Sequence, residues 1–432
     1  SCLFQVVLLF AMYTVSGAPV LTPWPSWSYV EVRDGAHMFW WLYNADRQDL
    51  PLVMWLQGGP GGSGSGFGNF AEIGPLDGDL KPRKTSWVQA ASVLFVDNPV
   101  GTGFSYTDRP DAYATDVATV ASDMLVLLRH FFKAKSEFQS VPFYIFSESY
   151  GGKMAAAISL ELTKVSSRHN VTSLSNISPF QVHDTNSVMT WGPYLYTTSL
   201  LDDLGLEEVM SAADAVKQAV EQQQFQKATE LWSVAETVVE QNTNGVNFYN
   251  ILTREPDERR TSVAGEDFVS LQARRHVRPL HGQSLSDLMN GPIRKKLGII
   301  PKNVTWGGQA EDVFSNMAGD FMRSVVDVVD QLLTAGVNVT VYNGQLDLIV
   351  DTMGQELWVK RLKWEGLRGF NELRWTPLDD PTSPGNTGAF CKTYKNFAFY
   401  WVLKAGHMVR QKGDRITNAP AVALSIVFLC LS

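Results

Sequence analysis

Four short runs of apolar and β-branched residues constrain the fold of this chain more than any other feature. Each is five or six residues long, and they lie at 52–56, 92–96, 141–146 and 337–342. Strands that are covered on both faces have this composition, because neither face meets water. Between and after these runs, residues 116–132 and 154–165 repeat apolar side chains at helical spacing. The sequence therefore predicts an α/β fold with a mostly parallel central sheet flanked by helices.

Three further segments have a recognisable pattern. Residues 28–43 alternate around the Asp34-Gly35 turn, which predicts an antiparallel hairpin at the start of the sheet. Residues 199–242 are rich in Ala, Glu, Gln and Val and have helical periodicity without a strand signal. The aromatic run 396–403 predicts a late strand. The core is therefore expected to be interrupted by a helical cap insertion.

The first 18 residues are an apolar run that ends in small side chains, as secretory signal peptides do. N-x-S/T sequons agree with passage through the secretory pathway, and they begin at Asn170, Asn176, Asn303 and Asn338. We therefore expect a secreted or lysosomal protein. The expected division is a signal peptide at 1–18, core at 19–190, a mainly helical cap at 191–300 and core again at 301–432.

Composition excludes several classes of protein. Of 432 residues, 45% are hydrophobic, which is ample for a large core and excludes a disordered chain. The formal net charge of -8 gives no basic footprint for nucleic acid, and no stable membrane association is expected. Three cysteines do not make a disulfide scaffold, and no metal-binding motif is present. Stability must therefore come from the core, and the sequence leaves the oligomeric state open.

Ser149 has the sequence context of a nucleophile elbow, the tight turn from a strand into a helix that exposes a reactive serine. It follows the apolar run 141–146, and Gly151 and Gly152 come behind it. Ser147 stands where such a turn normally has glycine, so the local string Ser-x-Ser-x-Gly is weak by itself. A plain strand that ends in a glycine turn has the same string, and the interpretation as a nucleophile depends on other segments.

The glycine-rich stretch 57–66 is the first of these segments. It leaves the run 52–56 and offers backbone N–H groups that no side chain obstructs, as an oxyanion hole requires. Residues 59–64 also fit the G-x-G-x-x-G pattern of dinucleotide-binding loops. Pro60 removes a donor, however, and no Gly-Lys-Ser/Thr follows for a phosphate loop. We therefore favour the oxyanion hole over nucleotide binding.

Asp347 and His407 provide the other two groups of a catalytic triad. Asp347 follows the run 337–342, and His407 follows the aromatic strand at 396–403. A turn aspartate and a structural histidine are the plainer interpretations of each residue. The chain order Ser149, Asp347, His407 is nevertheless that of α/β-hydrolases, and all three residues lie at strand ends. We therefore predict an α/β-hydrolase fold with a Ser-His-Asp triad.

These residues lie within longer motifs that resemble the serine carboxypeptidases almost from end to end. The most specific motifs are Trp55-Leu-Gln-Gly-Gly-Pro-Gly61, Phe95-Val-Asp-Asn-Pro-Val-Gly-Thr-Gly-Phe-Ser-Tyr106, Ser147-Glu-Ser-Tyr-Gly151, Trp191-Gly-Pro-Tyr-Leu-Tyr196, Tyr342-Asn-Gly-Gln-Leu-Asp347 and Gly406-His-Met-Val409. The resemblance implies that the protein removes C-terminal residues from peptides and proteins without a metal or a cofactor. It also implies that Ser149 attacks, His407 transfers the proton and Asp347 orients the imidazole.

The resemblance implies two further groups of site residues. The N–H groups of Gly59 and Tyr150 hold the oxyanion. Four residues bind the terminal carboxylate of the substrate, namely Gln57, Gly58, Glu72 and Glu148. Two close carboxyl groups resist double ionisation, so they can share a proton and donate hydrogen bonds to a carboxylate. We therefore expect hydrolysis to be best in mildly acidic solution.

Two segments depart from the family pattern. Residues 173–186 stand where the family has a core strand, but Pro179 makes this segment a poor central strand. Residues 410–432 replace a Pro turn and a closing amphipathic helix with an apolar tail. A loosened sheet would misplace Ser149 and His407, so a catalytically weak homologue that binds or scaffolds is an alternative function. Acyl transfer onto a small molecule, with an alcohol in place of water, is a second alternative.

Overall fold

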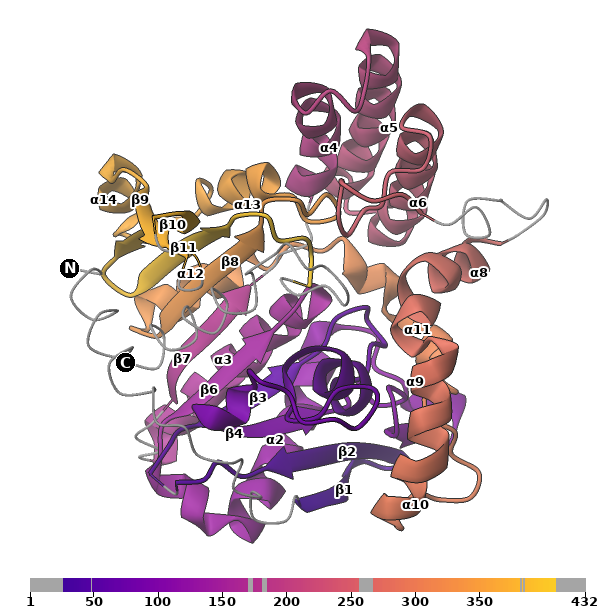
Figure 1. Ribbon diagram of the computed structural model, residues 1–432, viewed down its shortest axis with the longest axis vertical. Helices are drawn as coiled ribbons and strands as arrows, with labels where there is room; N and C mark the ends of the chain where they lie inside the picture. The colour runs from indigo at the N-terminus through magenta and orange to yellow at the C-terminus, as the bar shows by residue number, and fades with distance from the viewer. Residues whose placement is uncertain are drawn as a thin grey trace.

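The structure of the protein is a computed structural model that describes residues 26–47, 49–169, 174–180, 185–255, 267–380, 383 and 385–408 (Figure 1). The expected signal peptide, the sequon at Asn170 and the apolar tail 410–432 lie outside these residues.

The described strands form a single 11-stranded sheet with the order β1-β2-β4-β3-β6-β7-β8-β11-β10-β9, and β5 pairs with β2. They are β1 (Ser26–Arg33), β2 (Ala36–Tyr43), β3 (Leu52–Leu56), β4 (Ser92–Val96), β5 (Tyr106–Thr107), β6 (Phe143–Ser147), β7 (Leu174–Phe180), β8 (Asn338–Gly344), β9 (Thr376–Asp379), β10 (Thr387–Tyr394) and β11 (Phe397–Val402). Neighbours from β4 to β11 in this order pair in parallel, while the outer strands pair antiparallel. The predicted α/β fold with a mostly parallel central sheet is confirmed.

Both faces of the central strands are buried. Along β3, Leu52, Met54 and Leu56 belong to one hydrophobic cluster, while Val53 and Trp55 belong to another on the opposite face. Side chains of a strand alternate between faces, so a strand between two cores must be apolar throughout. This is the physical reason that the apolar runs in the sequence marked the parallel strands.

Helices of the core pack against the sheet and against each other. The helices of the described core are α2 (Val117–Ala134), α3 (Tyr150–His169), α11 (Ala310–Phe321), α12 (Val326–Thr334), α13 (Thr352–Val359) and α14 (Leu367–Glu372). The side chain of Asp116 starts α2 by accepting a hydrogen bond of 2.7 Å from the Thr119 N–H. In α3, which packs against α2 and β6, the first residue is Tyr150, directly after Ser149. The predicted helix after Ser149 is thus confirmed.

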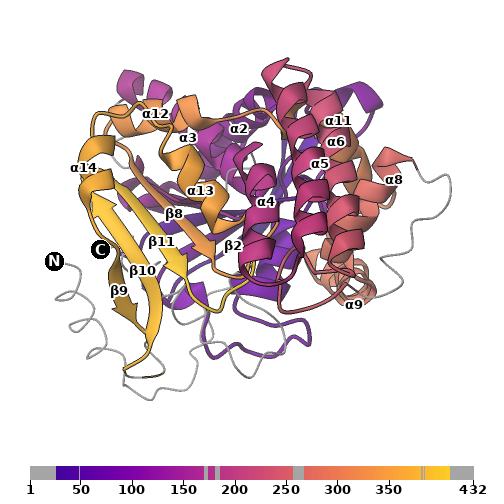
Figure 2. The same cartoon turned by 90° about the horizontal axis from the view of Figure 1, so that it is seen from above.

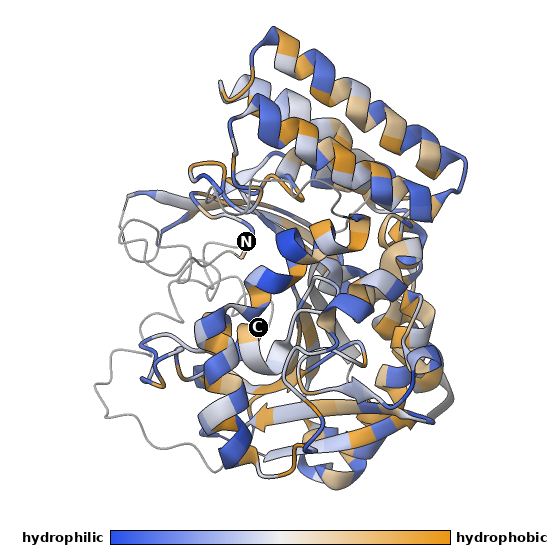
Figure 3. Cartoon of the chain, turned by 90° about the vertical axis from the view of Figure 1, so that its right-hand side faces the viewer, coloured by the Kyte–Doolittle hydropathy of each residue, from blue (hydrophilic) through white to orange (hydrophobic). Residues whose placement is uncertain are grey.

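The segment predicted as a cap is helical. It contains α4 (Thr185–Thr197), α5 (Asp203–Glu221), α6 (Phe225–Asn242), α8 (Phe268–Gln272), α9 (Gln283–Leu288) and α10 (Arg294–Leu297). Figure 2 shows α4, α5 and α6 side by side, and Figure 1 places them at one end of the molecule above the sheet. In Figure 3 hydrophilic and hydrophobic residues alternate along these helices, as in amphipathic helices with one buried face. The expected boundary at residue 191 falls inside α4.

The expectation that residues 173–186 make a poor central strand is wrong. Strand β7 forms there over Leu174–Phe180 and pairs in parallel with both β6 and β8. Its pairing with β8 shifts register between Ile177 and Phe180, the interval that contains Pro179. Proline has no N–H to give to the ladder, and the irregularity lets the strand continue past it. The sheet is therefore continuous beside the Ser149 turn.

Candidate active site

Ser149 lies in the turn that joins β6 to α3. Its φ angle is 57°, a left-handed conformation that is costly for a non-glycine residue and recurs at functional sites. A Cβ atom on Gly58 would lie 2.5 Å from the Ser149 Cβ and 2.8 Å from the Glu148 carbonyl oxygen. A Cβ on Gly151 would lie 2.5 Å from the carbonyl oxygen of Leu56. The tight turn therefore needs glycine at both positions.

Ser147 replaces the glycine that usually stands two residues before the nucleophile in such a turn. It is the last residue of β6, is fully buried and pairs with Leu56 of β3. A serine is small enough to fit at this position, so the departure from the G-x-S-x-G string does not prevent the turn.

The glycine-rich loop after β3 is held in place by a buried carboxylate. Asp97 follows β4 and accepts hydrogen bonds of 2.7 Å from the hydroxyls of Ser63 and Ser65, and one of 2.9 Å from the Ser65 N–H. Burial raises the pKa of Asp97. Earlier in the loop, Gly59 has a φ of 113° and precedes a cis peptide bond to Pro60. Asp97 therefore anchors the loop at Ser63 and Ser65, and the Gly62 N–H ties back its start by donating to the Gly58 carbonyl at 2.9 Å.

Asp347 and His407 come together from the ends of β8 and β11. These parallel neighbours place the two residues at the same edge of the sheet, and Asp347 Oδ2 lies 2.8 Å from His407 Nδ1. Asp347 Oδ1 also accepts a hydrogen bond from the Val350 N–H, and the His407 N–H donates to the Tyr249 carbonyl. Both side chains are almost fully buried. The imidazole is thus oriented through Nδ1, which leaves Nε2 for proton transfer.

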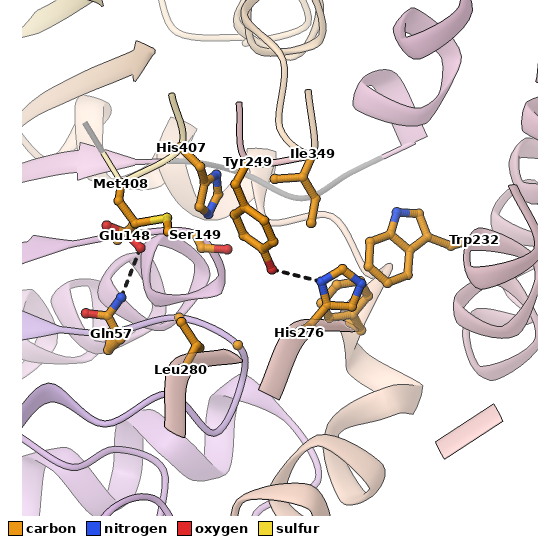
Figure 4. A pocket seen from close by; sticks show the side chains of 13 residues that line it. Gln57, Glu148, Ser149, Trp232, Tyr249, His276, Leu280, Ile349, His407 and Met408 are labelled. Carbon is orange, nitrogen blue, oxygen red and sulfur yellow. Dashed lines mark hydrogen bonds between the residues drawn. The ribbon is translucent and has the colours of Figure 1, made fainter. Parts of the chain in front are cut away.

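One cavity is lined by six of the predicted site residues, whereas Glu72, Tyr150 and Asp347 do not line it (Figure 4). It has about 370 Å³ of space not filled by protein atoms. Its lining includes Ser149, His407, Glu148, Gln57 and the two glycines Gly58 and Gly59. The ends of the parallel strands therefore bring these residues from three distant parts of the sequence to one concave site, as in other sheets that are covered by helices on both faces.

A hydrogen-bonded set of polar side chains forms one end of this cavity. The Gln57 amide donates to Glu148 Oε1 at 2.9 Å, and its own Oε1 accepts from the Trp55 indole N–H at 2.8 Å. Burial is the main cause of a pKa for Glu148 well above the usual range, and the charge of Glu72 and a hydrogen bond with Glu72 raise it further. Gln57, Glu72 and Glu148 are nearly inaccessible to solvent. The two carboxyl groups therefore hold a proton between them more firmly than exposed acids would.

Comparison with known protein families agrees with this geometry. Residues 24–418 match the model of the serine carboxypeptidase family. The chain belongs to the serine carboxypeptidase family. It is therefore a hydrolase of the α/β-hydrolase fold, and the resemblance seen in its motifs is confirmed.

Individual serine carboxypeptidases show how far the similarity extends. The retinoid-inducible serine carboxypeptidase of Homo sapiens is 56% identical over 431 residues, which cover 94% of this chain and 94% of the relative. The serine carboxypeptidase-like 51 of Arabidopsis thaliana is 39% identical and covers 93% of this chain and 91% of its own. The solved structure of Kex1, a prohormone-processing carboxypeptidase from Saccharomyces cerevisiae, has a TM-score of 0.76 at 19% identity, covering 95% of this chain and 91% of that one. This last likeness shows the shared fold.

No sequence motif indicated the group that supports the helix behind Ser149 in this serine carboxypeptidase. Tyr150 donates a hydrogen bond of 2.6 Å to Asp320 Oδ2, and the Lys153 ammonium lies 3.3 Å from the same oxygen. Lys153 also donates to the carbonyls of Asp320 and Phe321. All these groups are buried, so α3 is tied to the end of α11 at the turn that presents Ser149.

Residues of the helical segment form the other end of the cavity, and sequence reasoning missed them too. Figure 4 shows Trp232, Tyr249 and His276 across the cavity from Gln57 and Glu148. They come from α6, from the segment that follows it and from a π-helical turn at Ala273–Val277. No short motif marks such residues, because the way the helices pack decides which side chains reach the cavity.

The remaining sequence predictions lie away from the cavity. Asn303 and Asn338 are exposed, while Asn176 is a paired residue inside β7. Within the described part of the chain, no helix is both long and apolar enough to cross a membrane. Among the same residues, no cluster of three or more His, Cys, Asp or Glu side chains is arranged to hold a metal ion.

Proposed function

We propose that this protein releases the C-terminal residue of peptides and proteins through an acyl-enzyme formed on Ser149. The observation that carries the proposal is the 2.8 Å contact between Asp347 and His407, because His407 lines the same cavity as Ser149. His407 takes the Ser149 proton as the hydroxyl oxygen attacks the scissile carbonyl, and it returns this proton to the departing amine. Water then attacks the acyl carbonyl and gives a proton to His407, which passes it to the Ser149 oxygen as the bond to the shortened peptide breaks.

The N–H groups of Gly59 and Tyr150 are the proposed donors to the oxyanion. Tyr150 is the first residue of α3, and the amides at a helix N-terminus carry partial positive charge that favours an anion. Gly59 belongs to the loop that Asp97 fixes, so its amide would need no rearrangement when the negative charge develops. Preorganised donors of this kind stabilise the tetrahedral intermediate more than flexible ones.

Recognition of the terminal carboxylate by Gln57, Gly58, Glu72 and Glu148 would make the enzyme an exopeptidase. The raised pKa of Glu148 supports a protonated Glu148–Glu72 pair at acidic pH, and such a pair can donate a hydrogen bond to the incoming carboxylate. As pH rises and the pair loses its proton, repulsion between like charges should weaken binding. We therefore expect KM for N-blocked dipeptides to increase from pH 5 to pH 8.

A fluorophosphonate probe, which reacts with activated serines, tests whether Ser149 is a nucleophile. We expect the unaltered protein to be labelled and Ser149→Ala to remain unlabelled. Ser140→Ala is the matched control, because Ser140 is exposed and lies away from the cavity, and it should be labelled normally. A folded protein that the probe does not label would support the binding or scaffolding alternative.

Product analysis separates hydrolysis from acyl transfer. With an N-blocked dipeptide in water that contains a small alcohol, a carboxypeptidase gives mainly the free acid of the shortened substrate. At millimolar alcohol, water is about 10⁴-fold more abundant than the alcohol. Predominant formation of the ester would then mean that the enzyme binds and positions the alcohol, and it would support the acyltransferase alternative.

Secretion is proposed from the sequence, with a signal peptide at 1–18 and a secreted or lysosomal destination. The exposure of Asn303 and Asn338 supports glycan attachment at these two sequons. Glycosidase treatment of protein from a secretory expression host should lower its mass, and the double substitution Asn303→Gln and Asn338→Gln should reduce that loss.

A further inference from the structure

The cavity extends beyond the reacting groups to a second end with its own polar chemistry. In Figure 4, Gln57 and Glu148 lie on one side of Ser149 and His407, and His276 and Trp232 lie on the other. If the terminal residue of a peptide occupies the Gln57 end, the residue before the scissile bond must extend toward His276. This second end is therefore where the enzyme would contact the residue that stays on Ser149 in the acyl-enzyme.

A chain of hydrogen-bonded and ion-paired groups forms this end. The Tyr249 hydroxyl lies 2.9 Å from His276 Nδ1, and His276 Nε2 lies 2.8 Å from Glu236 Oε1. Behind them, Arg275 contacts Glu236 at 3.4 Å and Glu240 at 2.6 Å. Glu236 is fully buried and His276 is 5% exposed, so the chain is held inside the protein.

The Tyr249 hydroxyl lines the cavity and has capacity for another partner. A phenol has one donor and two acceptor positions, and the contact with His276 uses one of them. His276 Nδ1 is used by the contact with Tyr249, and its Nε2 faces Glu236 Oε1 at 2.8 Å without a well-directed hydrogen bond. Whichever of the two rings donates in their shared hydrogen bond, a substrate group with both a donor and an acceptor can bond to Tyr249.

Apolar side chains around this hydroxyl suit the stem of a long side chain. Trp232, Phe321, Ile349 and Leu280 line the same cavity. The surroundings are also acidic. An adjoining cavity is lined by Tyr249 and His276 together with three acidic residues, Glu236, Glu240 and Glu255. Arg275 also lines it and is a permanent cation, because a guanidinium does not lose its proton in proteins. A negatively charged side chain should therefore be disfavoured at this end.

We propose that Tyr249, held by His276 beside Glu236, is a specificity-determining residue for the substrate residue before the scissile bond, favouring a long side chain that has a hydrogen-bonding tip and no negative charge. The proposal rests on the proposed carboxypeptidase function. Glutamine meets the requirement because its amide both donates and accepts. Methionine has a stem of similar length without such a tip, and glutamate has the same shape with a negative charge.

Three substrates measure this preference, namely N-blocked Gln-Leu, Met-Leu and Glu-Leu at pH 6, where a free glutamate side chain is ionised. We expect kcat/KM for Gln-Leu to exceed that for Met-Leu and Glu-Leu by about 10-fold, the effect of one well-made hydrogen bond in a buried site. In Tyr249→Phe the Gln-to-Met ratio should fall to about 1, because this variant keeps the ring beside His407 and removes the hydroxyl.

Tyr113→Phe is the matched control. Its hydroxyl also bonds to a neighbour, Asp312 at 3.1 Å, but Tyr113 does not line the cavity, so the Gln-to-Met ratio should stay as in the unaltered protein. A ratio near 1 in the unaltered protein would overturn the proposal. An unchanged Gln-to-Met ratio in Tyr249→Phe would also overturn it. A purely structural role would give this result, because kcat/KM would then fall equally for both substrates.

The carboxypeptidase function can fail separately. Turnover of Met-Leu and labelling of Ser149 by the fluorophosphonate show that the enzyme works even if no preference for Gln-Leu is seen. Absence of both turnover and labelling would refute the proposed function, and the inference about Tyr249 with it.

Discussion

The two ends of the cavity are built in different ways. At the end formed by Gln57 and Glu148, and at the reacting groups beside it, the residues follow strands of the same parallel sheet, whose ladders fix where each chain segment emerges. At the other end, Trp232 and His276 come from helical segments that pack around the sheet. We therefore expect the chemistry to depend on the strand ends and the choice of substrate to depend on helix packing. Substitutions at the first end should change kcat, and those at the second should change the ranking of substrates.

The largest expected effect is at the sheet end. Asp347→Asn should lower kcat by about 10⁴-fold while the protein stays folded, because an amide can keep the contact with His407 Nδ1 but favours the wrong tautomer of the imidazole. Steady-state kinetics with an N-blocked dipeptide, together with circular dichroism, measures this. A loss below 10-fold would mean that Asp347 does not orient His407.

A smaller loss is expected from a methyl group placed against the Ser149 turn. In Gly58→Ala the new Cβ would lie 2.5 Å from the Ser149 Cβ, so the turn or the loop must move. A displacement of about 1 Å lowers the rate by about 100-fold. Gly291→Ala is the matched control in the helical segment, where nothing lies within 4 Å of the new atom. If kcat fell equally in the two variants, the rate would be no more sensitive to the Ser149 turn than to the helical segment.

Asp351 forms a contact between the sheet and the first helix of the helical segment, and its ionisation gives a third prediction. Asp351 follows β8 and starts α13, and it accepts a hydrogen bond of 2.7 Å from Thr190 of α4. Burial raises the pKa of Asp351 to about 8. Between about pH 4 and pH 8 the unfolded chain therefore binds fewer protons here than the folded protein, so this residue makes the free energy of unfolding decrease as pH rises.

Substitution tests the contribution of Asp351 directly. The slope that it adds is about 1.4 kcal/mol per pH unit over this range. In Asp351→Asn, which mimics the protonated acid, the free energy of unfolding should depend less on pH, as urea titrations at pH 5, 6 and 7 would measure. An unchanged slope would mean that Asp351 is ionised in the folded protein.

The same contrast explains what could be predicted from the sequence. The positions of Ser149, Asp347 and His407 after strand ends could be predicted because a buried parallel strand is apolar throughout, so its end is easily located. Strand β7 was misjudged because Pro179 is unfavourable in a central strand, while the shift of register that accommodates it cannot be seen in a sequence.

Other parts of the site depend on contacts between segments far apart in the chain. The pair of Lys153 with Asp320 joins residues 167 positions apart, and His276 meets Tyr249 only because of how the intervening turns pack. Helical periodicity indicates that a helix has a buried face, but it does not indicate what that face meets.

The central claim is that the site requires a free C-terminal carboxylate. The most direct test compares an N-blocked dipeptide with its C-terminal amide at pH 5, with Ser149→Ala as the blank. The account predicts rapid release of the terminal residue from the free acid, and a kcat/KM at least about 100-fold lower for the amide, which lacks the charged group that Gln57 and Glu148 would bind. Equal rates for the two substrates would contradict it.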